Sequence, residues 1–191
     1  MIYIASGGLG FLVIHLFDIF CLKRIPAAKP ATWLVGGGLL VYSLIMIALA
    51  PNKLPLPAWS TGIGWGLLII SISLLVYSLF INLPFRKTYL ATGVGDKLVV
   101  TGLYALVRHP GVHWFIITML ALVLVTRSQL MLIASPIFII LDIILVVIQD
   151  KFFFGRMFQG YYRYRRETPM LLPNRRSINT FKKGLRPARA K

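Results

Sequence analysis

The sequence predicts an all-α membrane protein with about five transmembrane helices. Of its 191 residues, 58% are hydrophobic and only 14% are charged, whereas soluble domains carry about 25% charged residues. The apolar residues gather in five runs, most of them near the roughly 20 residues that a helix needs to cross a bilayer core. A soluble fold of this length cannot bury so much apolar surface, so lipid must solvate part of it.

The first three runs predict three spanning helices. They cover residues 1–22, 31–50 and 59 to about 85. Charged residues or prolines close the first two: Lys23 follows the first run and Pro51 follows the second. Trp59 stands at the start of the third run, and tryptophan is enriched at the boundary between lipid and water. We therefore expect each run to be one helix that ends near the membrane surface.

The last two runs predict a helical hairpin. They cover residues 112–126 and 129 to about 148. Only Arg127 and Ser128 separate them, so the two helices should run antiparallel. The fourth run is short for a span, at about 22 Å of helix, and we expect it to begin slightly earlier or to lie against its neighbours. Pro136 predicts a kink in the fifth helix.

The distribution of basic residues predicts the orientation. Cytoplasmic loops of membrane proteins carry an excess of lysine and arginine. The links after the first and third runs and the C-terminal segment are rich in these residues, whereas the links after the second and fourth runs hold one each. We therefore expect an integral, multi-pass protein with its N-terminus outside and its C-terminus in the cytoplasm. Both long polar segments, 86–111 and 150–191, then share the cytoplasmic face.

The net charge of +16 indicates contact with lipid headgroups and not with nucleic acid. Twelve of the 21 basic residues lie at or after Lys151, and most of the others stand in short links between apolar runs. This is the distribution that sets topology and attracts anionic lipids. The last stretch, 174–191, is basic and poor in apolar residues, so we expect a flexible tail on anionic headgroups and not a packed element.

Few residues within the runs are suited to chemistry. The chain has one cysteine, Cys21, so it has no internal disulfide, and no metal site is predicted. Three ionisable residues lie inside the predicted spans: His15, Asp18 and Asp142. Ionisable groups in a bilayer are costly and often functional. They also occur as hydrogen-bonded pairs between helices, and the sequence leaves both interpretations open.

The two cytoplasmic segments are more informative. Arg108 and His109 stand at the membrane boundary, and Pro110 is well placed to begin a helix. An arginine and a histidine there suit a ligand carboxylate or ribose hydroxyl, but composition alone favours a topology signal beside an interfacial histidine. Residues 150–173 mix aromatic residues with arginines. They fit an amphipathic interfacial helix or the lid of a site that stacks a purine, and periodicity does not separate these.

Together the two segments resemble the integral-membrane methyltransferases typified by isoprenylcysteine carboxyl methyltransferase and the phospholipid N-methyltransferases. The first motif of that family is matched by Leu98, Val99, Gly102, Tyr104, Arg108, His109 and Pro110. The second is matched, with one residue deleted, by Phe158, Tyr161, Tyr164, Pro169 and Pro173. The resemblance covers about residues 86–173 of a predicted five-span domain, 1–173. Chain length and the predicted hairpin fit the small prokaryotic members, which implies a prokaryotic inner membrane.

The resemblance implies methyl transfer from S-adenosylmethionine (SAM) to a lipophilic acceptor that arrives from the bilayer. SAM is an activated methyl donor, so the protein mainly supplies orientation and excludes water. The family pattern implies that Asp150 and Arg108 are catalytic, with Asp150 facing the positive end of the cofactor. The implied cofactor-binding residues are Gly102, Tyr104, Arg108, His109, Pro110, Asp150, Tyr161 and Tyr164.

Some residues depart from the family pattern. The paired glutamates of the family fall on Asp150 and Lys151, and the tyrosine after the first motif is Val112. Carboxyl methylation in the family also uses an arginine just before the glutamates, where this chain has residues 146–149, Val-Val-Ile-Gln. This weakens the case for isoprenylcysteine as the acceptor. An alternative is therefore a non-catalytic relative that acts as a membrane binding or scaffold protein. A third is a membrane redox or isomerase protein that uses membrane histidines, with His15 and His113 as haem ligands, but no paired-histidine spacing supports it.

Overall fold

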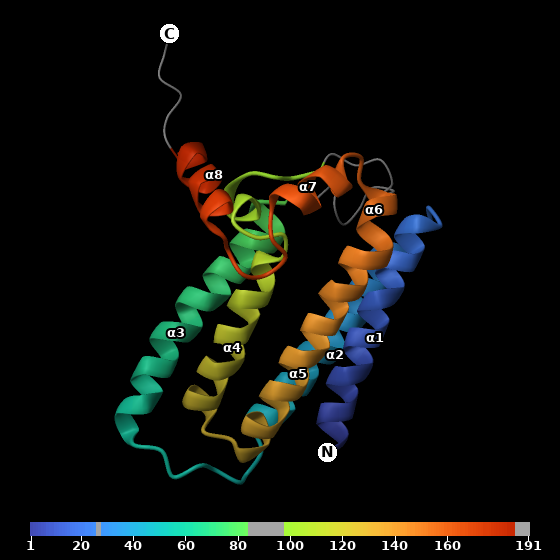
Figure 1. Ribbon diagram of the computed structural model, residues 1–191. Helices are drawn as coiled ribbons and strands as arrows, with labels where there is room; N and C mark the ends of the chain where they lie inside the picture. Colours follow the sequence, from blue (N-terminus) through green and yellow to red (C-terminus); the bar gives the residue numbers. More distant parts are fainter. Residues whose placement is uncertain (26–27, 84–97, 186–191) are drawn as a thin grey trace.

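The computed structural model describes residues 1–25, 28–83 and 98–185. In these ranges the chain is helical, with no strand and one isolated bridge between Lys53 and Ser128. Five apolar helices run side by side, and shorter helices gather at the end of the bundle where the C-terminus lies (Figure 1). The expectation of an all-α membrane protein agrees with this architecture. Residues 84–97, where the first polar segment begins, lie outside the described ranges, as do residues 186–191 of the predicted tail.

The five apolar helices correspond to the five runs. They are α1 (Ile2–Leu22), α2 (Ala28–Ala48), α3 (Ala58–Val76), α4 (Pro110–Thr126) and α5 (Gln129–Ile148). A turn of π-helix, η1 (Tyr77–Ile81), extends α3. Four helical stretches of the described chain are long and apolar enough to cross a membrane, namely Ile2–Leu22, Ala28–Ala48, Ala58–Ile81 and Gln129–Met157. The fifth helix, α4, is apolar but shorter.

The predicted break between α4 and α5 is a tight turn. Arg127 ends α4 in the left-handed conformation, with φ of 54°. Ser128 then caps α5, because its side chain accepts a hydrogen bond from the backbone N–H of Met131. The two helices form the expected antiparallel hairpin (Figure 1). The link between α2 and α3 packs against this turn: the N–H of Leu54 donates to the carbonyl of Arg127, and that of Gln129 donates to Asn52.

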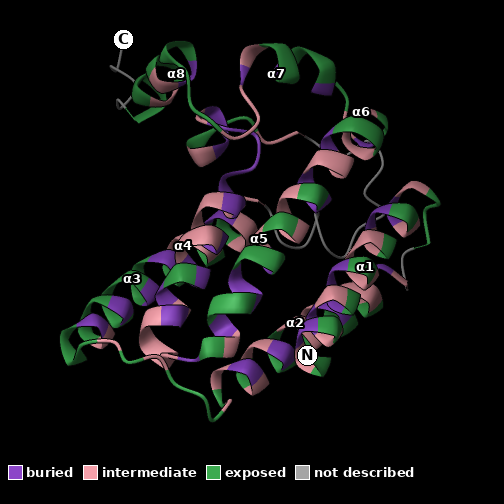
Figure 2. Cartoon of the chain, turned by 60° about the horizontal axis from the view of Figure 1, so that its bottom comes forward, coloured by how far each residue is buried: buried purple, intermediate pink, exposed green. Residues whose placement is uncertain are grey.

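The core of the bundle lies where α1, α2, α4 and α5 meet. Its buried residues are Ile4, Phe11, Ile47, Phe115, Met119, Val123, Met131, Ala134, Phe138 and Leu145. Glycine allows α1 and α2 to approach closely, since a Cβ at Gly10 would stand 2.8 Å from the carbonyl oxygen of Gly36. Exposed residues, many of them large and apolar, line the outer faces of the helices (Figure 2). This distribution suits a bundle surrounded by lipid.

The described parts of the two polar segments, residues 98–111 and 150–185, share one end of the bundle, as the sequence predicts. A 3₁₀ turn, η3 (Gly102–Ala105), precedes α4. A turn of π-helix, η4 (Gln149–Phe153), follows α5 and leads to α6 (Phe154–Met157), α7 (Tyr161–Glu167) and α8 (Arg175–Leu185). The N-terminus lies at the opposite end (Figure 1). An odd number of parallel or antiparallel helices accounts for this separation of the two termini.

Helix α8 differs from the flexible arm expected at residue 174 and beyond. Asn174 begins the helix, because its side-chain oxygen accepts a hydrogen bond from the N–H of Ser177 at 2.8 Å. Ile178 and Phe181 are partly buried, whereas the basic residues of α8 are exposed, and the helix packs against η3. The apolar residues are few but stand at helical spacing, so the low overall hydrophobicity of the stretch concealed an amphipathic helix.

Candidate active site

The segment before α4 is held in place by its glycine and its tyrosine. Gly102 has φ of +61°, a conformation that favours glycine, and a Cβ there would stand 2.5 Å from Oδ1 of Asn82. The same oxygen accepts a hydrogen bond from the N–H of Leu103 at 3.1 Å. Tyr104 is buried, and its hydroxyl donates to the carbonyl of Ser78 at 3.1 Å. Both predicted site residues therefore fix the segment to the end of α3.

Backbone contacts join this segment to the chain after α7. The N–H of Arg108 donates to the carbonyl of Pro169 at 2.9 Å, and that of His109 donates to Met170 at 3.2 Å. The hydroxyl of Tyr164 donates to the carbonyl of Tyr104 at 2.6 Å. The two motif segments, which are far apart in the sequence, therefore form one structural unit.

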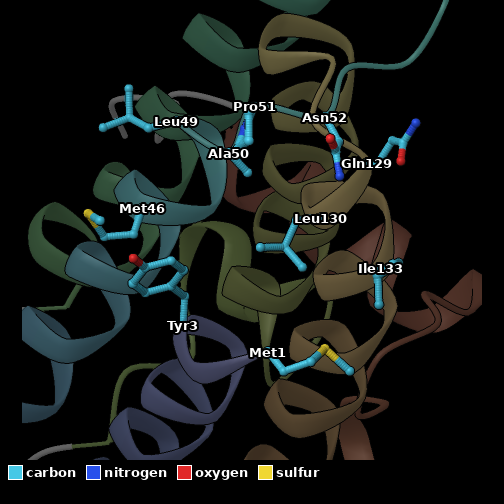
Figure 3. A pocket seen from close by; sticks show the side chains of 10 residues that line it. All are labelled: Met1, Tyr3, Met46, Leu49, Ala50, Pro51, Asn52, Gln129, Leu130 and Ile133. Atoms are coloured by element: carbon cyan, nitrogen blue, oxygen red, sulfur yellow. The ribbon is translucent and has the colours of Figure 1, made fainter.

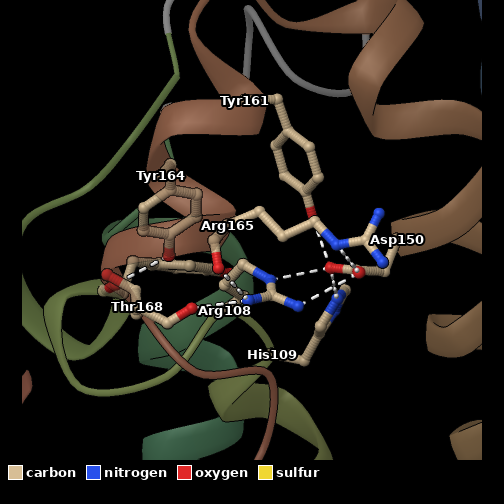
Figure 4. A network of polar contacts seen from close by, with 8 residues as sticks. Arg108, His109, Asp150, Tyr161, Tyr164, Arg165 and Thr168 are labelled. Atoms are coloured by element: carbon tan, nitrogen blue, oxygen red, sulfur yellow. Dashed lines mark hydrogen bonds and ion pairs between the residues drawn. The ribbon is translucent and has the colours of Figure 1, made fainter.

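The centre of this unit is a buried ion pair between Arg108 and Asp150 (Figure 4). Nε of Arg108 lies 2.7 Å from Oδ1 of Asp150, and Nη2 lies 3.0 Å from Oδ2. This fork geometry is the strongest form of an arginine–carboxylate contact. Nη1 donates to the carbonyls of Arg165 and Thr168. Each of the three guanidinium nitrogens therefore donates to an oxygen of the protein.

Two further side chains reach the Asp150 carboxylate. The hydroxyl of Tyr161 donates to Oδ1, and Nε of Arg165 lies 3.4 Å from Oδ2. Burial raises the pKa of Tyr161 and of Tyr164 well above the usual value, so both phenols stay protonated and act as donors. Asp150 therefore sits in a ring of donors from the protein itself, and Arg108, Asp150 and Arg165 together carry a net charge of +1.

His109 differs from the other members because one of its nitrogens is unused. The imidazole is buried and stacks on Phe154, with ring centroids 5.7 Å apart. Its Nε2 lies 3.6 Å from Oδ1 of Asp150, beyond hydrogen-bond distance, and has no hydrogen-bond partner among the described residues. Burial lowers the pKa of His109, so the ring is neutral at pH 7. A buried nitrogen without a partner costs free energy unless a ligand or water meets it.

The structure therefore divides the predicted site residues into two groups. Five form the network of Figure 4, which we call the Asp150 network: Arg108, His109, Asp150, Tyr161 and Tyr164. Gly102, Tyr104 and Pro110 support it. Pro110 is buried as the first residue of α4, where its missing N–H costs nothing. Sequence reasoning missed Phe154, Arg165 and Thr168. Arg165 and Thr168 contribute backbone carbonyls, which leave no trace in a sequence motif. The Arg165 side chain, which also reaches Asp150, and Phe154 stand inside the second motif segment.

The departures from the family pattern also have defined positions. Asp150 is buried, whereas the neighbouring Lys151 is exposed, so the lysine ammonium points away from the network. Val112 is buried in α4. Gln149 donates from Nε2 to Oδ2 of Asp18 at 2.9 Å, on the side of η4 that faces α1.

Asp18 lies in a second buried polar group, which we call the Asp18 cluster: His15, Asp18, Lys29 and Gln149. Nδ1 of His15 is 3.9 Å from Oδ2 of Asp18. Lys29 is fully buried, interacts electrostatically with Asp18 and stands over the ring of Phe17. Of the two interpretations of His15 and Asp18, the hydrogen-bonded cross-helix group is the one that these contacts support. Asp142 is separate, and its buried Oδ2 has no partner among the described residues.

Two cavities occur near the ends of the bundle. One, of about 390 Å³, lies at the end opposite the network, between the start of α1, the end of α2 and the start of α5 (Figure 3). None of the predicted site residues lines it. The other, of about 360 Å³, is bordered by Tyr164 and Thr168 of the network end and by α8. Within the described ranges, no group of three histidine, cysteine or acidic residues is placed to hold a metal ion.

These features define a membrane-embedded α-helical bundle with a buried arginine–aspartate site at one end. Residues 33–163 match the family described as "Protein of unknown function (DUF1295)". The match covers more than half of the chain, and the chain belongs to this family. It includes α3, α4, α5 and most of the Asp150 network, and it ends within α7. No curated protein and no solved structure matches the chain.

Proposed function

We propose that this protein transfers a methyl group from SAM to a lipophilic acceptor at the cytoplasmic face of the membrane. The observation that carries the proposal is the meeting of both motif segments around Asp150, with the buried Nε2 of His109 left without a partner. All the helices α1 to α5 then cross the bilayer. At 17 residues, α4 is about 26 Å long, slightly less than the bilayer core.

The residues present fit such a cofactor. His109 offers a neutral nitrogen for a hydroxyl or an amine, and Phe154 and Tyr161 stand in edge contact beside it. The net positive charge around Asp150 suits the carboxylate of the amino-acid part of SAM. When bound, SAM supplies a methyl group on a sulfonium, which needs no further activation. The protein then has to orient the acceptor in line with the methyl group and keep water out.

The geometry favours different roles for the two residues that the resemblance makes catalytic. Both oxygens of Asp150 accept from Arg108, and Tyr161 donates to one of them. We therefore assign Asp150 and Arg108 as positioning residues, which hold α5, α7 and the segment before α4 together. His109 is the residue that contacts the cofactor. The acceptor enters the site from the bilayer. In this orientation the N-terminus lies outside the cell.

Cofactor binding by the purified protein in lipid nanodiscs tests the proposal. We expect saturable binding of SAM in the micromolar range, weakened at least tenfold by His109→Ala. His113→Ala is the matched control, because His113 lies on α4 four residues beyond the network histidine, and it should bind as the unaltered protein does. NAD⁺ also carries an adenosine and should compete only weakly. Absence of SAM binding in every lipid mixture would contradict the proposal.

The alternative, a non-catalytic scaffold protein, is favoured by one observation. Each nitrogen of Arg108 donates to a protein oxygen, as in a purely structural ion pair. Transfer of a labelled methyl group from SAM into a total lipid extract separates the two. Label in the lipid fraction that depends on His109 supports the enzyme, whereas SAM binding without any transfer supports the scaffold.

A further inference from the structure

A polar pocket lies beside α7 and α8, next to the Asp150 network, with which it shares Tyr164. Its volume is about 360 Å³. Arg165 of α7 points to Asp150, whereas Arg163 and Glu167, two residues to either side, line the pocket. Residues two apart on a helix face in nearly opposite directions. The pocket is lined by Leu98, Val100, Gly160, Arg163, Tyr164, Glu167, Thr168, Arg176 and Thr180.

Two arginines from different helices converge in this pocket. Nε of Arg163 lies 3.2 Å from Oε1 of Glu167, and Nη2 of Arg176 on α8 lies 4.0 Å from the same oxygen. The arginine side chains are 80% and 70% exposed, so water competes for both and the contacts are weak. Two guanidinium groups that share one carboxylate oxygen are placed to bind an anion with several oxygens, such as a phosphate group.

Apolar residues occur in the pocket wall and at both ends of α8. Val100, in the wall, is 43% exposed, and Leu185 at the end of α8, which does not line the pocket, is 66% exposed. Leu172, in the turn before α8, is 80% exposed. The rest of α8 is strongly basic, with Arg175, Lys182 and Lys183 on its outer side. A phosphate site with a basic rim and exposed apolar neighbours fits a lipid, which has a charged headgroup and acyl chains.

We propose that this pocket binds the phosphate group of an anionic phospholipid between Arg163 and Arg176. The lipid fixes α8 to α7 at the membrane surface. The match to the family ends at residue 163, so Glu167, Arg176 and Thr180 lie beyond the matched residues. The proposal does not depend on methyl transfer, because no member of the Asp150 network supplies a charge to the pocket.

Titration of the purified protein with phosphatidylglycerol in detergent micelles tests the site. The double variant Arg163→Gln/Arg176→Gln should bind this lipid at least tenfold more weakly. The control Arg175→Gln/Lys182→Gln removes the same charge from exposed positions outside the pocket and should change the affinity less than threefold. Glu167→Gln should tighten binding, because it removes the carboxylate that competes for both guanidinium groups. Equal losses of affinity in the two double variants would show that surface charge alone binds the lipid, and the proposed site would be wrong.

The source of the phosphate is tested separately. Phosphatidylcholine, inorganic phosphate and glycerol 3-phosphate are titrated under the same conditions. Weak binding of all three, with tight binding of phosphatidylglycerol, supports the lipid site. If the soluble phosphates bind as tightly as phosphatidylglycerol does, the pocket takes a soluble ligand and the lipid proposal is wrong. The SAM titration is run on the same variants. SAM binding without lipid binding would show that the lipid site is wrong while the proposed function stands, and lipid binding without SAM binding would show the reverse.

Discussion

The helical turn η4 separates two buried polar groups that are built differently. On one side, Asp150 accepts hydrogen bonds from Arg108 and Tyr161. On the other side, Gln149 donates to Asp18 of α1. The Asp150 network joins segments near the bundle end and is dense in donors. In the Asp18 cluster, by contrast, two side chains of α1 meet one side chain of α2 and one of η4. The many hydrogen-bond donors around Asp150 are therefore typical of a functional site, whereas the few contacts of Asp18 are typical of a structural link between helices.

Neighbouring residues of η4 serve both groups. Consecutive side chains of any helix point in different directions around its axis, so Gln149 reaches α1 while Asp150 reaches Arg108. Turns of π-helix are rare and occur frequently at functional sites. The turn η4 thus links the packing of α1 to the geometry of the candidate active site. Substitutions can measure how much each group contributes to stability and to SAM binding.

The largest effect should follow Asp150→Asn. Arg108 would remain buried without a carboxylate, and removal of one partner of a buried ion pair typically costs about 3–5 kcal/mol. We expect a large drop in the unfolding midpoint in mixed micelles and loss of SAM binding. Lys151→Gln is the control, since its side chain is exposed, and it should unfold as the unaltered protein does. A midpoint close to normal for Asp150→Asn would show that the pair contributes little.

Asp18→Asn should have a smaller effect. Asparagine still offers an oxygen to Gln149, but the electrostatic attraction between Asp18 and the buried Lys29 is lost, which we expect to cost roughly 2 kcal/mol. SAM binding should change less than threefold, because no member of the Asp150 network contacts Asp18. Equilibrium unfolding and the SAM titration measure the two quantities. A loss of SAM affinity as large as that of Asp150→Asn would place the Asp18 cluster within the active site.

The same contrast explains what the sequence predicts and what it does not. Lipid-facing helices must be apolar along their length, so hydropathy alone located all five helices to within a few residues. The fourth helix begins at Pro110, two residues before its apolar run, as the position of this proline predicts. The motif residues were correctly gathered at one end. Their pairing was not predicted, because residues 42 positions apart leave no spacing signal and the resemblance directed Asp150 toward the cofactor.

Tyr164→Phe should have a modest effect. The variant removes one hydroxyl, which donates to the carbonyl of Tyr104, and a single such bond contributes about 1 kcal/mol. We expect a small decrease in the unfolding midpoint, and faster hydrogen exchange at the N–H of Leu106 and Val107, which close the turn at η3. Tyr162→Phe, at a mostly exposed neighbour, is the control. Unchanged exchange in η3 would mean that Tyr164 does not secure this segment.

The smallest effect is the coupling between the two groups. A double-mutant cycle of Tyr161→Phe and Gln149→Leu compares the sum of the two single losses with the loss in the double variant. Groups that share a structural element show coupling of about 0.5 kcal/mol or more, whereas distant groups are additive to within about 0.5 kcal/mol. Gln149 holds the turn that contains Asp150. Without its contact with Asp18, the hydrogen bond from the Tyr161 hydroxyl to Asp150 should contribute less to the free energy of unfolding. The double variant should therefore lose less stability than the sum of the two single variants. Strict additivity would show that η4 holds its shape without α1, and that the Asp150 network is independent of the Asp18 cluster.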